Sequence, residues 1–313
     1  MSIVISEFMD DESVDSLRDR FTTHYDPTLV DAPERLRELL PDARALIVRN
    51  RTRVDAALLA AAPKLEVVGR LGVGLDNIDL DACRQRGIAV YPATGANARA
   101  VAEYVLALSL VALRGAYGSS AEVAAGNWPR PALSEGREAG GKTLGLVGFG
   151  DIGQLTARLA RALDLRVVAH DPAYPDDASL WSAHGVTPLG LAGLLDQSDI
   201  VSLHLPLTEN TRGLFGHENL SRMKPGAILI NTSRGGIVDE SALAIAVQTG
   251  RLGGAVLDVF AQEPLSAGSR LTGIPNVWLT PHIAGLSAEA NGRVGALIAE
   301  RVTAALDQHK GNA

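Results

Sequence analysis

Three side chains suited to proton transfer and anion binding follow predicted strands in the second half of the chain. They are Arg234, Glu263 and His282. A histidine exchanges protons near neutral pH, a carboxylate orients an imidazole, and a guanidinium donates paired hydrogen bonds to a carboxylate. Because α/β folds bind ligands beyond the carboxyl ends of their strands, we take these three as candidate catalytic residues. Singly, each also fits a structural role in a loop, and their spacing alone does not define a site.

A glycine-rich turn (148–153, GFGDIG) joins a predicted strand to a predicted helix. This is the context of a dinucleotide-binding turn, in which Gly148 permits the tight bend, Gly150 lets the backbone approach a pyrophosphate and Gly153 lets helix and strand pack closely. Asp171 ends the next strand, 171 − 153 = 18 residues further on, where an acid bonds the adenosine ribose hydroxyls. Since its charge repels the extra phosphate of NADP, the pattern predicts NAD.

The elements that must position these residues alternate between short β-branched runs and helical patterns, which is typical of parallel sheets covered by helices. Strands are predicted at 3–6, 44–48, 65–69 and 88–91, then at 143–147, 167–169, 200–203, 227–230, 255–257 and 277–279; helices are predicted at 33–40, 54–62, 98–113, 154–163 and 288–306. The last six strands predict a complete doubly wound sheet. Residues 115–141 are interpreted as a linker. The apolar helix 98–113 is explained by a subunit interface or by core burial.

Composition excludes several classes of protein. The chain has 313 residues, 46% of them hydrophobic, and a net charge of 29 − 36 = −7 without a basic block, which argues against a nucleic-acid or anionic-membrane partner. Its single cysteine, Cys83, can form neither a disulfide within the chain nor a cysteine-based metal site. No signal-peptide pattern and no run of about 18 apolar residues is found, so we expect a cytoplasmic protein. We also expect no metal site.

These motifs, together with the run at 72–79 (GVGLDNID), resemble the D-2-hydroxyacid dehydrogenase family over nearly the whole chain. The resemblance implies a doubly wound Rossmann-type cofactor domain (98–285) inserted into a smaller flavodoxin-like α/β substrate domain (1–97 plus 286–313). It also implies that Arg234, Glu263 and His282 are the family's catalytic arginine, glutamate and histidine. In hydride transfer from C2 of a hydroxy acid, His282 would accept the hydroxyl proton, Glu263 would orient it, and Arg234 would bind the carboxylate.

The resemblance extends to residues that would contact the cofactor. His204 and Pro206 match positions at the adenine end, and Asp258 matches the group that binds the nicotinamide amide, although a structural role for His204 stays open. The full set expected to contact NAD is Gly148, Gly150, Asp151, Ile152, Gly153, Asp171, His204, Pro206, Thr232, Arg234, Asp258, His282 and Gly285.

Residues of the first half would contact the substrate. Val73 and Gly74 lie in a loop whose backbone N–H groups suit a carboxylate, and Asn97 matches a substrate-side polar residue of the family. Arg49 and Arg51 alternate at a strand end, where phosphoglycerate-type members have an arginine for the distal anion. If these arginines are not simply solvated, the substrate carries a second anion on C3, as 3-phosphoglycerate or 3-sulfolactate does.

Three alternatives remain at this stage. The chain ends soon after its last predicted helix, without the C-terminal regulatory extension of many phosphoglycerate dehydrogenases, which favours a catabolic or sulfonate role. A hydroxypyruvate or glyoxylate reductase would leave the arginines as surface residues. A corepressor-like NAD-binding protein would act by partner recognition, although no disordered tail is evident. For the enzyme we expect a homodimer.

Overall fold

The computed structural model describes residues 2–115 and 117–308, and the chain divides into two compact units. Unit 1 comprises residues 1–97 and 286–313, and unit 2 comprises residues 98–285. Each unit has its own parallel sheet and its own core, so each is described by itself.

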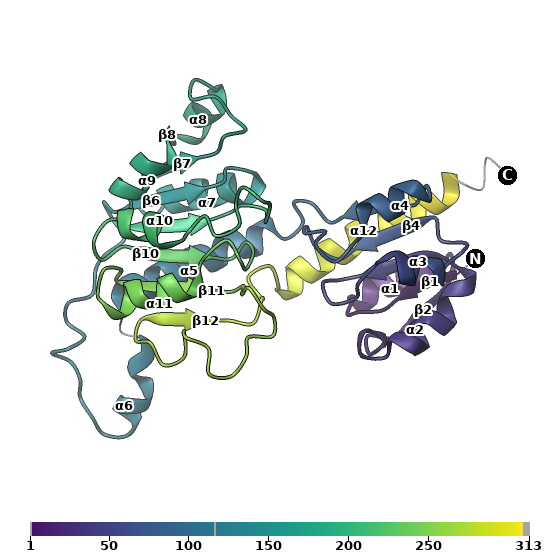
Figure 1. The fold of residues 1–313 in the computed structure, drawn as a ribbon, viewed down its shortest axis with the longest axis horizontal. Coiled ribbons are helices and arrows are strands. Elements are labelled where there is room, and N and C mark those ends of the chain that lie inside the picture. Colours follow the sequence, from purple (N-terminus) through teal and green to yellow (C-terminus); the bar gives the residue numbers. More distant parts are fainter. Residues whose placement is uncertain (1, 116, 309–313) are drawn as a thin grey trace. The chain divides into compact units, whose positions relative to one another are not determined.

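Unit 1 is built on a five-stranded parallel sheet in the order β2-β1-β3-β4-β5, which is the flavodoxin-like order (Figure 1). Its strands are β1 (Ser2–Ile5), β2 (Thr22–Tyr25), β3 (Ala43–Val48), β4 (Val67–Arg70) and β5 (Ala89–Pro92); its helices are α1 (Asp11–Arg18), α2 (Pro33–Leu39), α3 (Ala56–Ala60), α4 (Leu80–Gln85) and α12 (Ala288–Gln308), with short 3-10 turns η1 (Leu29–Asp31) and η2 (Leu40–Asp42). Strand β2 was not predicted, because its sequence TTHY is polar and half exposed at the sheet edge.

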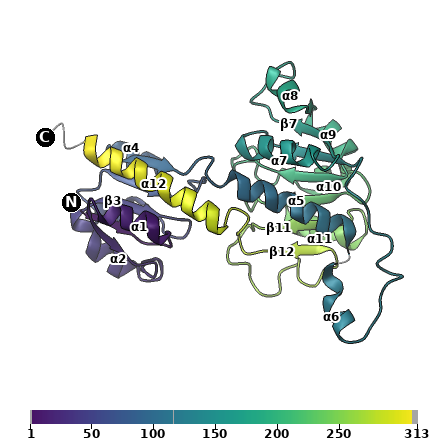
Figure 2. The same cartoon turned by 180° about the vertical axis from the view of Figure 1, so that it is seen from behind.

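Alternate residues of β1 and β3 point into two different apolar clusters, as a pleated strand requires. Ile3 and Ile47 pack with α1 and α12 on one face, whereas Val4 and Leu46 pack with α2, α3 and α4 on the other. Helix α12 runs beside α1 (Figure 2) and lies so close to β4 that a Cβ on Gly69 would come within 2.6 Å of the Ile298 side chain. The C-terminal helix therefore completes the core of the N-terminal sheet.

Unit 2 holds a seven-stranded parallel sheet in the order β12-β11-β10-β9-β6-β7-β8. Its strands are β6 (Thr143–Val147), β7 (Arg166–His170), β8 (Thr187–Pro188), β9 (Ile200–Leu203), β10 (Ile228–Asn231), β11 (Gly254–Leu257) and β12 (Val277–Leu279); its helices are α5 (Ala98–Arg114), α6 (Ser120–Ala124), α7 (Asp151–Arg161), α8 (Ser179–His184), α9 (Leu191–Gln197), α10 (His217–Arg222) and α11 (Glu240–Gln248), with the 3-10 turn η3 (Tyr117–Ser119). The six predicted strands are present, and the two-residue edge strand β8 adds a seventh.

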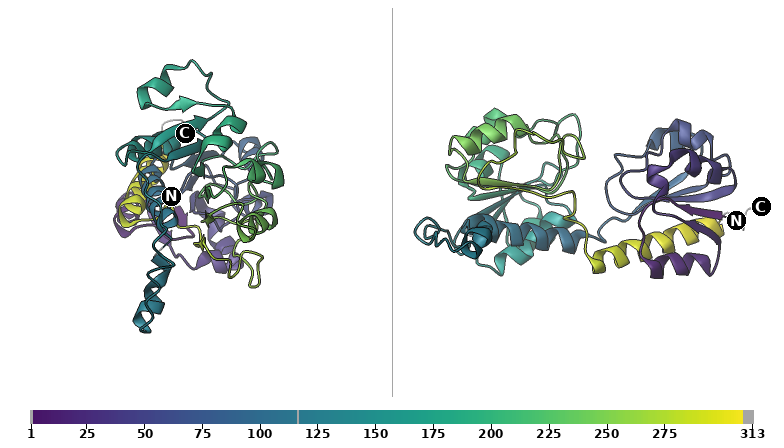
Figure 3. Two further views of the ribbon diagram at one scale, coloured as in Figure 1. Left: turned by 90° about the vertical axis from the view of Figure 1, so that its left-hand side faces the viewer. Right: turned by 90° about the horizontal axis from the view of Figure 1, so that it is seen from below.

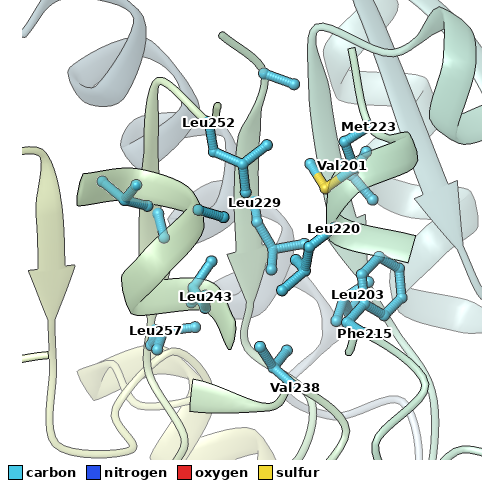
Figure 4. Packing of buried hydrophobic residues seen from close by; sticks show 14 of the residues in the cluster. Val201, Leu203, Phe215, Leu220, Met223, Leu229, Val238, Leu243, Leu252 and Leu257 are labelled. Atoms are coloured by element: carbon cyan, nitrogen blue, oxygen red, sulfur yellow. The ribbon is translucent and has the colours of Figure 1, made fainter. Parts of the chain in front are cut away.

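Helices cover both faces of this sheet (Figure 3), so the unit is doubly wound. On one face, side chains from α9, α10 and α11 pack with the strands around Leu229 and Phe215, which is fully buried (Figure 4). On the other face, α5 and α7 pack over Leu146 and Ile230. The chain reverses its winding direction between β6 and β9, and such a switch point is where doubly wound sheets bind ligands.

The apolar character of α5 is explained by this packing. Val101, Val105, Leu106 and Leu113 are buried in the core of unit 2, whereas Leu110 is 37% exposed. The segment after α5 includes α6, which projects from the body of unit 2 (Figures 1 and 2). Within the described ranges, no helix combines the length and apolarity needed to cross a bilayer.

Candidate active site

Three neighbouring strands of unit 2 bring the three candidate catalytic residues to one edge of the sheet. Arg234 follows β10, Glu263 follows β11 and His282 follows β12 (Figure 1). Because the strands are parallel and adjacent, their carboxyl ends share an edge.

Glu263 and His282 form a direct pair. The Nδ1 atom of His282 lies 2.8 Å from Oε2 of Glu263, and the side chains are 34% and 33% exposed. The second carboxylate oxygen, Oε1, accepts the backbone N–H of Phe260 at 3.0 Å. Since an ionised carboxylate only accepts hydrogen bonds, Nδ1 carries the proton and Nε2 of a neutral His282 presents its lone pair. The pair therefore provides an oriented base that is reachable from solvent.

Several groups set the charge state of Glu263. Burial raises the pKa of this carboxyl, but hydrogen bonds from His282 and from the Phe260 N–H lower it, as do the charges of His282 and Arg234. The net pKa lies below the usual value for glutamate, so the carboxylate stays charged at neutral pH.

The loop that carries Arg234 is shaped by Asn231, which is 1% exposed at the end of β10. Its Oδ1 accepts the backbone N–H of Ser233 at 3.0 Å, and its Nδ2 donates to the carbonyl of Arg234 at 2.9 Å. The next residue, Gly235, faces the loop of Glu263, because a Cβ there would lie 1.7 Å from the carbonyl oxygen of Phe260. The absence of a side chain at position 235 lets the arginine and glutamate loops touch.

Asp258 is fully buried at the end of β11, and both of its carboxylate oxygens hold the His282 loop. Oδ1 accepts the N–H of Ile283 and Oδ2 accepts the N–H of Ala284, each at 2.8 Å. The backbone carbonyl of Asp258 also accepts the N–H of His282 at 2.8 Å. A contact between Asp258 and a nicotinamide amide stays a prediction, whereas its hold on this loop is direct.

The glycine turn between β6 and α7 has three glycines in three different surroundings. Gly148 has a φ of +99°, and a Cβ on it would meet the carbonyl oxygen of His204 at 2.4 Å. A Cβ on Gly153 would meet the Gly148 carbonyl oxygen at 2.5 Å, so α7 packs tightly on the turn. Around Gly150, which caps α7 without a side-chain hydrogen bond, no protein atom lies within 4 Å of an added Cβ. This leaves open space at a helix N-terminus, where anions bind.

Asp171 follows β7 and faces this turn. Its Oδ2 accepts the N–H of Phe149 at 2.8 Å, and its Oδ1 accepts the N–H of Ala173 at 2.9 Å. The carboxylate is therefore held beside the turn, as the spacing from Gly153 predicts for a ribose-binding acid.

His204 follows β9, the strand next to β6. Its Nε2 lies 3.0 Å from the hydroxyl of Ser202, and burial lowers the pKa of His204 to about 4. Pro206 is exposed, and its carbonyl accepts the hydroxyl of Thr211 at 2.7 Å. The remaining cofactor candidates lie in the same unit: Asp151 and Ile152 in the first turn of α7, Thr232 after β10, and Gly285 at the unit's end.

In unit 1, Arg49 and the 72–78 loop follow the adjacent strands β3 and β4. The side chain of Asn77 joins them, donating to the carbonyls of Arg49 at 3.3 Å and Thr52 at 2.7 Å. Within the loop, Val73 is 37% exposed, and Gly74 is half-buried. Asn97 ends the first segment of unit 1, and its buried Oδ1 has no hydrogen-bond partner among the described residues.

The structure separates Arg49 from Arg51. Strand β3 ends at Val48, so strand alternation does not extend to them. Arg51 is exposed and forms an ion pair with Asp31, whereas the half-buried Arg49 donates to the Asn291 Oδ1 at 2.8 Å and lies 5.8 Å from the centre of the Phe8 ring.

Comparison with known proteins assigns this arrangement to a family. Residues 106–284 match the family model described as D-isomer specific 2-hydroxyacid dehydrogenase, NAD binding domain. The chain belongs to the D-2-hydroxyacid dehydrogenases. It is therefore an NAD-dependent oxidoreductase, and the resemblance seen in its motifs is confirmed.

Relatives of this dehydrogenase include two that bear on substrate. It is 53% identical over 304 residues to the (S)-sulfolactate dehydrogenase of Chromohalobacter salexigens, covering 97% of this chain and 98% of that protein. It is 43% identical over 306 residues to the D-3-phosphoglycerate dehydrogenase of Mycobacterium bovis, covering 97% of this chain but only 56% of that protein. Among solved structures, the NAD-dependent formate dehydrogenase of Staphylococcus aureus in complex with NAD has a TM-score of 0.83 at 28% identity, covering 97% and 95% of the two chains.

The residues of the dehydrogenase fit NAD. The space around Gly150 at the N-terminus of α7 suits a pyrophosphate, and the adjacent Asp171 carboxylate suits ribose hydroxyls. The hydroxyl oxygen of Thr232 is buried without a hydrogen-bond partner among the described residues, which suits a polar group of a bound cofactor. These are the residues that would hold NAD.

Two residues that hold backbone next to candidate site residues, Asn231 and Glu7, were not predicted from the sequence. Asn231 shapes the Arg234 loop, as described above. Glu7 is 4% exposed, and its carboxylate accepts backbone N–H groups of Arg49 at 2.7 Å, Arg51 at 3.1 Å and Thr52 at 3.0 Å. A signal exists for each, because Asn231 is the polar last residue of the apolar strand β10 and Glu7 lies two residues after the end of β1.

Proposed function

We propose that this dehydrogenase transfers a hydride between NAD and C2 of a 2-hydroxy acid that carries a sulfonate on C3, as 3-sulfolactate does. NAD, when bound, supplies the hydride acceptor. The Nε2 atom of His282 accepts the proton of the C2 hydroxyl, because Nδ1 is bonded to Glu263. Arg234 binds the substrate carboxylate and polarises the C2 oxygen. In reduction, the same His282 returns the proton.

We infer the class of substrate from the exposure and the contacts of the Arg49 guanidinium. Its guanidinium is half-buried and held by an amide and an aromatic ring, and among the described residues it has no ion-pair partner. Burial lowers the pKa of Arg49, and the nearby Glu7 charge opposes this shift. A cation that is kept partly from water and forms no direct ion pair within the described part of the chain is suited to an anion of the substrate.

A sulfonate fits this cation better than a phosphate. A sulfonate carries one negative charge, which one guanidinium balances, whereas a phosphate monoester carries about −1.5 to −2 at neutral pH. Arg51 is already balanced by Asp31. The 53% identical relative named (S)-sulfolactate dehydrogenase supports the same choice. A hydroxypyruvate reductase, the name of a 40% identical relative, would need no distal cation.

The test is a screen of NAD reduction with 3-sulfolactate, 3-phosphoglycerate, glycerate, lactate and malate. Charge-assisted hydrogen bonds contribute about 1.5–3 kcal/mol each, so we expect kcat/KM for 3-sulfolactate to exceed that for lactate by about 100-fold. Preference for 3-phosphoglycerate would show that the anion on C3 of the substrate is a phosphate and not a sulfonate. Equal turnover of all five acids, or efficient turnover only of glycerate, the reduced form of hydroxypyruvate, would overturn the proposal.

We also infer that the enzyme pairs with a second copy of itself through the 117–141 segment. Here Trp128 is 74% exposed and Val123 is 43% exposed, on an arm that projects from unit 2 (Figure 1). Such apolar surface on a projecting arm favours an interface between copies. Sedimentation should give a dimer for the native chain and a shift toward monomer for Trp128→Ser. A native chain that sediments as a monomer would contradict this inference.

A further inference from the structure

A partly buried network of hydrogen bonds reaches the His282 loop from helix α5, and the reaction as proposed above does not use it. The hydroxyl of Tyr104 on α5 bonds the hydroxyl of Thr280, and the Thr280 hydroxyl donates to Oδ1 of Asp258 at 2.6 Å. Tyr104 and Thr280 are 176 residues apart in sequence. The contact therefore ties the first helix of unit 2 to the loop that ends this unit.

The donor and the acceptor of each hydrogen bond in this network can be assigned. Backbone N–H groups of Ile283 and Ala284 donate to the Asp258 carboxylate, so both of its oxygens act as acceptors. The Thr280 hydroxyl must therefore donate its one hydrogen to Asp258, which leaves its lone pairs for Tyr104. Burial, together with the Asp258 charge, raises the pKa of Tyr104 against the effect of its hydrogen bond, so Tyr104 remains a donor.

The His282 backbone depends on this network. His282 has a φ of +57°, in the left-handed region that a residue with a side chain seldom adopts. Its N–H bonds the carbonyls of Asp258 at 2.8 Å and Thr280 at 3.1 Å. Three consecutive N–H groups, those of residues 282, 283 and 284, are thus bound to Asp258. A backbone conformation of this kind persists only when its surroundings hold it.

We propose that Tyr104 and Thr280 are positioning residues for His282. They anchor the Asp258 carboxylate, which holds the backbone of residues 282–284 and so aims the imidazole at the substrate. The proposal rests on the proposed role of His282 in proton transfer. Neither residue touches the reacting atoms, so each acts through the geometry of the histidine loop.

The test compares Thr280→Val, which keeps the shape of the side chain but loses the hydroxyl, with Thr280→Ser, which keeps the hydroxyl. Because misplacing a catalytic group by about 1 Å costs as much as about 100-fold in rate, we expect kcat of Thr280→Val to fall by about 10-fold to about 100-fold. Thr280→Ser should retain most of the activity. NADH affinity, read by nucleotide fluorescence, should be unchanged in both variants.

Two further readouts separate positioning from a general structural role. With NADH deuterated at the transferred position, the isotope effect on kcat should rise in Thr280→Val, because a misplaced proton carrier slows the chemical step. Tyr104→Phe should lower kcat in the native background but have no further effect in the Thr280→Val background, since Tyr104 acts only through Thr280. Matched controls are Thr249→Val at the end of α11 and Tyr174→Phe, which packs on Trp181.

The outcomes distinguish the two proposals. If His282→Ala keeps full activity, the proposed role of His282 fails. If His282→Ala is inactive while Thr280→Val has native kcat and isotope effect, only the positioning role fails. Weaker NADH binding by Thr280→Val with unchanged kcat at saturation, or additive effects of the two substitutions, would also overturn the positioning role. Thr280→Ser provides a folded comparison should Thr280→Val lose stability.

Discussion

The Nδ1 atom of His282 lies 2.8 Å from Oε2 of Glu263, although 19 residues separate them in the chain. The contact arises because β11 and β12 are adjacent and parallel, so the loops that follow them meet. It leaves Nε2 as the ring nitrogen that the proposed mechanism assigns to the substrate.

Glu263→Gln should lower kcat by at least about 100-fold, because its single amide oxygen cannot accept both the Nδ1 proton of His282 and the Phe260 N–H, and a neutral amide does not stabilise the protonated imidazole. The native pH profile should also reflect the lowered pKa of Glu263. The carboxylate is charged above that pKa, so any activity loss from its protonation should appear only below the usual range for glutamate. The measurement is kcat and kcat/KM from about pH 4 to about pH 9.

Glu240→Gln is the matched control for this substitution. Glu240, the first residue of α11, accepts the N–H of Ala261 at 2.7 Å, and Ala261 lies in the loop that carries Glu263. A glutamine oxygen can accept that single bond equally well. Native activity in Glu263→Gln would remove the carboxylate from the proposed mechanism.

Arg49→Ala and Arg51→Ala should behave differently. Loss of the half-buried Arg49 should raise KM for 3-sulfolactate by about 10-fold to about 100-fold and leave KM for lactate unchanged, since only the former has a distal anion. Arg51 is 58% exposed and paired with Asp31, so its removal should change either KM less than about threefold. Steady-state kinetics with both substrates decides, and equal effects of the two substitutions would contradict the assignment of the anion to Arg49.

The sequence predicted those parts of the fold and candidate site that depend on local pattern. The apolar strands of both sheets and the doubly wound class follow from period and turn signals, and Arg234, Glu263 and His282 from motifs. Strands β2 and β8 were missed because an edge strand needs no apolar face, and β8 has only two residues. The sequence pattern predicts an element when that element must bury an apolar face, and gives no signal when it need not.

Side-chain direction could not be predicted in the same way. The sequence groups Arg49 with Arg51, but only the packing of Asn291 and the position of Asp31 show that they face different partners. Asp258 matches a cofactor-binding position, yet its carboxylate holds a loop more than twenty residues away in the chain. Such contacts depend on which strands are neighbours, which no single segment encodes.

Gly235→Ala should impair catalysis and stability together. The added Cβ would lie 1.7 Å from the Phe260 carbonyl oxygen, so the arginine and glutamate loops must move apart. We expect a kcat loss of about 100-fold, the scale of a displacement of about 1 Å, and a lower melting temperature. Gly193→Ala in α9 is the control, because no atom lies within 4 Å of its Cβ and alanine favours a helix by about 1 kcal/mol. Native kcat in Gly235→Ala would show that the loops need not touch.

His204 should make the fold sensitive to acid. Burial lowers the pKa of His204 from 6.5 to about 4, so the folded chain resists a proton that the unfolded chain accepts. The unfolded state is therefore favoured progressively as the pH falls from about 6.5 to about 4, by about 3 kcal/mol in all. His204→Asn should flatten the dependence of unfolding free energy on pH over this interval. Denaturant unfolding at several pH values measures the slope, and the same slope in native protein and His204→Asn would show that His204 titrates normally.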